Sequence, residues 1–166
     1  MTTDGISGLG DSAEVRFRRI TGATRALRAK DGDAVLFESN IEIKRAGAKT
    51  LNQVRAVKYI PLVALYEKTD TWYVVPAPDV VRLVSSKTRG QHTENPFESA
   101  TLSIQNLDAF SLSDERELKD AVRRAVHRGQ AFPDLKRAMQ KVLSDSKALA
   151  TSSKDEIQVI LSRLGL

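Results

Sequence analysis

The chain has 166 residues, of which 41% are hydrophobic and 28% are charged, a balance typical of a folded domain rather than a disordered chain. It contains no cysteine, which excludes disulfides, thiolate zinc sites and thiol nucleophiles. No apolar run is long enough to span a bilayer, and the first residues lack the pattern of a secretory signal. We therefore expect a cytoplasmic protein of a prokaryote or virus that does not bind a membrane.

Positive charge is concentrated in the first third of the chain. The formal net charge is +5, and residues 1–60 hold 11 Lys and Arg against 7 Asp and Glu. A basic surface suits a polyanion such as nucleic acid, although solvated faces alone could give the same composition. The cations that we expect to contact DNA are Arg16, Arg19, Arg45, Lys49, Arg55 and Lys58.

A first helix is predicted to begin at Asp11 or Ser12, either of which can act as its N-cap. We expect it to end or to be interrupted at Thr21-Gly22. The ten residues that begin the chain are rich in Gly, Ser and Thr, so we expect them to be mobile.

Three strands are predicted to follow as a meander. Residues 24–30 fit either a continued helix or a strand, and the hairpin signal Asp31-Gly32 favours the strand. Two apolar runs, at 34–37 and 41–43, flank a Glu-Ser-Asn break and predict a second hairpin. On its second strand Ile41 and Ile43 share one face, because side chains alternate along a strand.

A helix is predicted from Thr50 through Lys58, because Thr50 and Gln53 have the spacing of a capping box. The elements expected after it are a strand at 61–66, a strand beginning at 72, a helix beginning at 76–79, a long polar loop at 85–99 and a short strand at 101–104.

The remainder of the chain is predicted to be helical. Its apolar residues recur at helical spacing in three stripes, namely Leu118, Ala121, Val122, Ala125 and Val126, then Leu135, Ala138, Met139, Val142 and Leu143, then Ile157, Ile160, Leu161 and Leu164. We expect an α/β core over residues 1–105 and a helical C-terminal extension over 106–166 that packs on the core, on a partner subunit or on DNA.

The pair Glu42 and Lys44 is the strongest candidate for chemistry. The chain has four triplets with an acid two residues before a lysine, but only this one lies on a predicted strand, where both side chains share a face. Asp33 begins the neighbouring strand and can approach Glu42 across the hairpin. Two carboxylates suit Mg²⁺, which lowers the pKa of a bound water, and a lysine can stabilise phosphate charge. The alternative is a surface ion pair, which contributes roughly 0–1 kcal/mol.

These residues carry a resemblance to a known superfamily. Asp33-Ala-Val-Leu-Phe followed by Ile41-Glu42-Ile-Lys44 resembles the signature of the PD-(D/E)xK nucleases, which include restriction endonucleases, Holliday-junction resolvases and repair nucleases. Gly32 stands where the signature has proline. The resemblance covers about the first hundred residues. It implies a restriction-endonuclease-like core of helix, three-strand meander, helix and strands, and a DNA endonuclease that uses Mg²⁺ or Mn²⁺ with Asp33, Glu42 and Lys44 in catalysis.

The resemblance also implies two further site residues. Glu14 matches a helix glutamate that many members use as an additional metal ligand, and Gln53 matches a polar residue near the site. Each has a structural alternative, because Asp11 with Glu14 and Thr50 with Gln53 both have capping-box spacing.

One active site cuts one strand, so we expect a homodimer of two-fold symmetry. The alternative functions are a non-catalytic nucleic-acid-binding or assembly module with the same fold, and an unrelated α/β protein in which Glu42 and Lys44 are structural. His92 and His127 are the two histidines and lie far apart in the sequence, which disfavours histidine-dependent chemistry.

Overall fold

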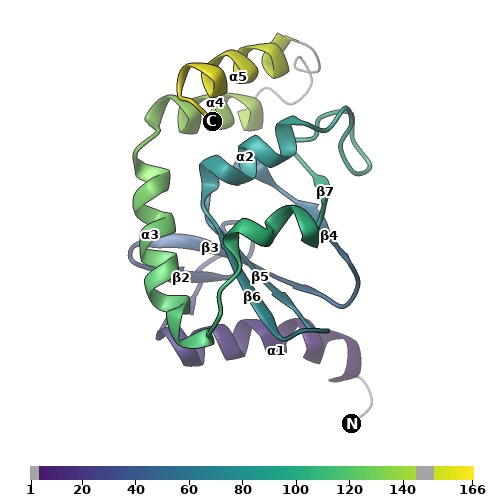
Figure 1. Ribbon diagram of the computed structural model, residues 1–166, viewed down its shortest axis with the longest axis vertical. Coiled ribbons are helices and arrows are strands. Elements are labelled where there is room, and N and C mark those ends of the chain that lie inside the picture. Colours follow the sequence, from purple (N-terminus) through teal and green to yellow (C-terminus); the bar gives the residue numbers. More distant parts are fainter. Residues whose placement is uncertain (1–3, 145–151) are drawn as a thin grey trace.

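The computed structural model describes residues 4–144 and 152–166, with side chains from residue 13 onward and from 154 onward after the gap. Within these residues a mixed sheet of five strands forms the centre of the molecule (Figure 1). The strand order is β1-β2-β3-β5-β6, with β3 and β5 parallel and the other pairs antiparallel. Their bounds are β1 (Thr24–Arg25), β2 (Ala34–Leu36), β3 (Ser39–Ala46), β5 (Leu62–Tyr66) and β6 (Thr71–Val75). The predicted α/β class is confirmed.

Helices α1 (Asp4–Thr21) and α3 (Leu118–Gln130) cover one face of this sheet. Phe17 of α1 is fully buried there, and its ring centroid lies 6.4 Å from that of Trp72 on β6. The apolar stripe of α3 packs into the same cluster, so the first helix and the helical region are joined through one core.

The other face carries a second apolar cluster. It is covered by α2 (Ala77–Ser85), α4 (Pro133–Ser144), α5 (Ser152–Arg163) and a separate two-stranded sheet of β4 (Thr50–Val54) and β7 (Ala100–Ser103). In Figure 1, α4 and α5 lie at the end of the molecule opposite α1. Because these helices bury side chains against β5 and β6, the helical region packs on the α/β part. None of the described helices has the length and apolar character needed to cross a membrane.

The predicted helix from Thr50 to Lys58 is wrong. The segment forms β4 and a 3₁₀ turn at Ala56–Lys58. Leu51 and Val54 are both buried, and the register shifts between them by a β-bulge, with Gln53 at a φ of 54°. The extra residue of a bulge places positions three apart on one face, which is also the spacing of a helix.

The two hairpins differ in detail from their predicted form. The second one turns at Phe37 and Glu38, with φ values of 53° and 60°, and Ser39 and Asn40 already belong to β3. Two successive residues in the left-handed region form the tight turn that matches strand twist. In the first hairpin only Thr24–Arg25 pairs with β2, and residues 26–33 form a loop.

The first helix begins at Asp4, seven residues before the predicted cap at Asp11. The strand predictions near residues 61, 72 and 101 and the helix prediction at 76–79 are confirmed by β5, β6, β7 and α2. The three C-terminal helices are also confirmed, although Leu143 is exposed rather than buried.

Candidate functional site

The β2–β3 hairpin holds Asp33 next to Glu42. Ala34 pairs with Ile41 at the start of β2, which brings the preceding residue, Asp33, close enough to Glu42 for the two charges to interact. The backbone N–H of Asp33 donates to the carbonyl of Ile41 at 2.9 Å, and its Oδ2 accepts the N–H of Ile43 at 2.8 Å. The carboxylate of Asp33 thus accepts a backbone N–H of β3 in place of a carbonyl of the neighbouring strand, which fixes its position.

Two lysines flank Glu42. The Nζ of Lys44 lies 3.8 Å from Oε1 of Glu42, and the Nζ of Lys58 lies 3.1 Å from Oε2. The three side chains are between 14% and 19% exposed, so the charges are partly shielded from water. The cluster is therefore more buried than an ordinary surface ion pair. Charges that are partly removed from water are tolerated when they are paired, as these are.

Lys58 reaches Glu42 from the 3₁₀ turn that precedes β5. Tyr59 ends this turn in the left-handed conformation, with a φ of 49°, and its hydroxyl donates to the carbonyl of Gly129 at 2.9 Å. Burial raises the pKa of Tyr59 to about 12, so the hydroxyl stays protonated and keeps donating. The α3–α4 junction therefore fixes the backbone that carries Lys58.

Burial raises the pKa of the Asp33 carboxyl above its ordinary value. The hydrogen bond from Ile43 opposes this shift, the charge of Glu42 adds to it, and the charges of Lys58 and Lys44 oppose it. The folded protein thus holds a carboxylate whose ionised form is disfavoured by its surroundings, which is common at functional sites.

We expect the substitution Asp33→Asn to raise the melting temperature by roughly 1–4 °C at pH 7.5. The folded pKa of Asp33 is raised, so its ionisation destabilises the folded state once the pH exceeds the ordinary Asp value of about 3.9. Asparagine keeps an oxygen for the Ile43 N–H and carries no charge. Calorimetry at pH 7.5 and pH 4.0 checks this: the gain should shrink at the lower pH, and an equal gain at both values would contradict it.

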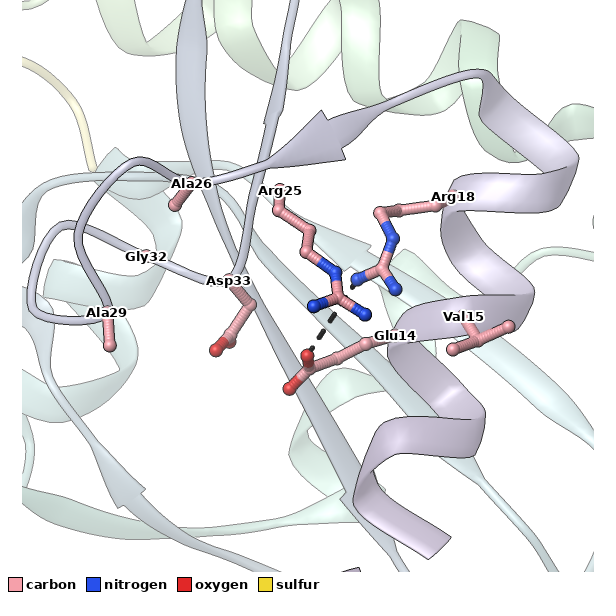
Figure 2. Close-up of a pocket in the computed structure, with 8 residues that line it drawn as sticks. All are labelled: Glu14, Val15, Arg18, Arg25, Ala26, Ala29, Gly32 and Asp33. Carbon is pink, nitrogen blue, oxygen red and sulfur yellow. Dashed lines mark ion pairs between the residues drawn. The ribbon is translucent and has the colours of Figure 1, made fainter. Parts of the chain in front are cut away.

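A hollow of about 380 Å³ opens beside Asp33, between α1 and the loop 26–33. Glu14 and Arg18 of α1 and Arg25 of β1 share it with Asp33 (Figure 2). Glu14 forms an ion pair with Arg18 at 4.0 Å. Figure 2 shows the two arginine side chains and the two carboxylates directed into the same space.

Gln53, the fifth predicted site residue, lies elsewhere. It is exposed on β4, and its backbone N–H donates to Oε1 of Gln91 at 2.6 Å. The structure brings Asp33, Glu42 and Lys44 together and leaves Gln53 in the second sheet, because the predicted helix that would have carried it is a strand.

Three of the six cations predicted to contact DNA form ion pairs with acidic side chains of the protein. Arg16 forms ion pairs with Asp70 and Glu115 and lies 5.6 Å from the ring centroid of Trp72. Arg45 forms an ion pair with Glu67. The third, Lys58, is bound to Glu42.

Of the remaining three, Arg55 is exposed, and its Nε donates to the carbonyl of Glu98 at 3.1 Å. Arg19 and Lys49 are exposed as well.

Asp33 and Glu42 carry carboxylate oxygens, the ligand type that small hard cations prefer. No three or more Asp, Glu, His or Cys side chains converge as a metal site among the residues that the structure describes, so Glu14 does not complete a three-carboxylate set. Mg²⁺ needs only one or two protein carboxylates, because waters and substrate phosphate fill its other positions. Asp33 and Glu42 would hold the ion, and Lys58 at Glu42 would compete with it for that carboxylate.

Sequence reasoning missed two features of this region. Lys58 was expected at DNA, and its pairing with Glu42 depends on a left-handed turn that no local pattern shows. Arg18 and Arg25 were not among the predicted DNA contacts. Arg18 lies on α1, one helical turn after Glu14, and Arg25 lies on β1, and both line the hollow.

A comparison with known protein-family models gives no match, and none was found among curated proteins or solved structures.

Proposed function

We propose that the protein is a metal-dependent DNA endonuclease with a restriction-endonuclease-like core. The observation that carries the proposal is the cluster of Asp33 and Glu42 with Lys44, which forms at the open end of the β2–β3 hairpin. The order of α1, the β1–β2–β3 meander and a crossover to β5, parallel to β3, supports the same assignment. In this chain the crossover contains β4 and a 3₁₀ turn in place of a helix.

The side chains divide the work of hydrolysis. When Mg²⁺ is bound, it supplies a water of lowered pKa and offsets phosphate charge. Asp33 and Glu42 would hold the ion, and the hydrogen bond from the Ile43 N–H fixes the Asp33 carboxylate. Lys44 places its ammonium beside Glu42, where a point cation stabilises the charge that develops on the phosphate.

One observation favours a second function, a non-catalytic nucleic-acid-binding module. The ammonium of Lys58 lies 3.1 Å from Glu42 and already neutralises it, so the cluster is stable without a cation. In such a module the two lysines and the carboxylates would be a structural network under a basic surface.

The test is cleavage of supercoiled plasmid, linear duplex and branched DNA by the purified chain. We expect nicked or linear products with about 5 mM Mg²⁺ or Mn²⁺, because one or two carboxylates with waters and substrate phosphate are enough to bind such an ion. With EDTA we expect none, because the carboxylates alone do not activate water.

A preparation that binds DNA but leaves all three substrates intact with either metal would contradict the nuclease and support the module. Absence of both binding and cleavage would contradict both functions. Unfolding curves recorded for the same preparation show that the protein tested is folded.

A further inference from the structure

The loop between β1 and β2 presents an apolar side chain to water. Leu27 is 99% exposed, more than any other large hydrophobic side chain in the described part of the chain. Val159 on α5, at 56%, is the next of them. Isolated exposed leucines are ordinary, so exposure alone assigns no role.

The surroundings of Leu27 are cationic. Arg25, Arg28 and Lys30 are exposed on the same short segment. Asp31 is the acid within it and is already paired with Arg28, its Oδ2 lying 2.8 Å from Nε. An apolar tip among cations suits a polyanion with apolar faces, which describes nucleic acid, better than it suits an apolar protein surface.

The loop forms a turn directly after Leu27 and packs against β3 at its end. The backbone N–H of Asp31 donates to the carbonyl of Arg28 at 3.0 Å, which closes a turn directly after Leu27. At Gly32 a side chain would meet the carbonyl of Ile41 at 3.1 Å, so the end of the loop packs tightly against β3. The tip is therefore anchored at Asp33, one residue beyond Gly32.

The hollow beside Asp33 lies at the base of this loop. Ala26 and Ala29 line it from the loop, and Val15 lines it from α1 on the opposite side (Figure 2). Arg18 on α1 and Arg25 on β1 direct their guanidinium groups into the hollow between these residues (Figure 2).

The carboxylates of Glu14 and Asp33 line the same hollow, and Arg18 is paired with Glu14 at 4.0 Å, so a phosphate there would be bound mainly by the exposed Arg25. A guanidinium group binds phosphate with two parallel hydrogen bonds, and apolar side chains accept a sugar or base.

We propose that Leu27 is a wedge that enters the base stack, and that the hollow receives the nucleotide it displaces. Apolar side chains on DNA-binding proteins separate base steps in this way, at a cost that is lowest for unpaired bases. The substrate class is thus DNA with an unpaired or weakly stacked nucleotide. This inference rests on the proposed function for its choice of DNA, and it brings the displaced phosphate next to Asp33.

The experiment uses a duplex with 2-aminopurine beside one unpaired nucleotide and a fully paired control, with the whole chain in EDTA at saturating concentration. We expect a fluorescence rise of several-fold for the wild type on the first duplex, because unstacking relieves quenching. Leu27→Ser should lose at least four-fifths of this rise. Because the Leu27 side chain is exposed to water, the melting temperature of the Leu27→Ser variant should stay within about 2 °C of the wild type.

Val159→Ser is the matched control, since it removes an exposed apolar group on α5 and should leave the signal unchanged. A Leu27→Ser variant with the full wild-type rise overturns the wedge, and so does a wild type that gives no rise at saturation. The readout needs no metal, so a positive signal from a chain that cleaves nothing supports the wedge while the nuclease proposal fails. Cleavage without the fluorescence rise would overturn the wedge and support the nuclease proposal.

Discussion

Glu42→Gln is expected to lower Mg²⁺-dependent DNA cleavage by about 100-fold or more, the scale on which metal and electrostatic contributions act. Glutamine keeps the shape of the side chain but has no charge for the ion, and its amide group faces the ammonium groups of Lys44 and Lys58. Lys44→Ala is expected to have a loss of similar size, because it removes the cation at the developing phosphate charge. Initial rates of plasmid nicking measure both effects.

The chain contains its own control for this experiment. Glu117 and Lys119 form the same acid-x-lysine triplet, but they lie exposed at the start of α3. Glu117→Gln and Lys119→Ala should each retain nicking within about threefold of the wild type, as expected for surface changes. Wild-type rates in the Glu42 variant, or equal losses in both triplets, would refute the site.

Phe17→Ala is expected to lower the free energy of unfolding by about 3–5 kcal/mol, the usual loss for a buried phenylalanine. Phe17 is fully buried in the cluster that joins α1 to the sheet, and its ring packs at a tilt against Trp72. The corresponding fall in melting temperature is roughly 6–20 °C for a chain of this length. Denaturant unfolding followed by circular dichroism gives both quantities.

Val15→Ala on the same helix serves as the reference, since Val15 is exposed and its truncation should cost less than about 1 kcal/mol. A loss below that value for Phe17→Ala would mean that α1 is not held by this core. The placement of Glu14 beside Asp33 would then lack its support.

The site hairpin was predictable because its signals are local. Alternation along 41–44 decides which side chains share a face, and the acid at residue 33 needs only an adjacent antiparallel strand to reach Glu42. The turn itself lies at Phe37 and Glu38, neither of which is a usual left-handed residue, so its position could not be read from composition.

The helix prediction for residues 50–58 was wrong because the structure of this segment depends on distant contacts. A β-bulge gives Leu51 and Val54 the spacing of a helix, and its partner β7 is about fifty residues away in the sequence. Lys58 depends on the same segment, and a hydrogen bond from Tyr59 to Gly129 fixes its backbone. Contacts of such long range leave no trace in a local pattern.

The bond between the Tyr59 hydroxyl and the Gly129 carbonyl has an evolutionary consequence. It lets a change at the junction of α3 and α4 reposition Lys58 against Glu42 without touching either residue. We therefore expect substitutions at this junction to affect the Glu42 charge network. In related chains, we expect residues at this junction to covary with those at positions 58 and 59.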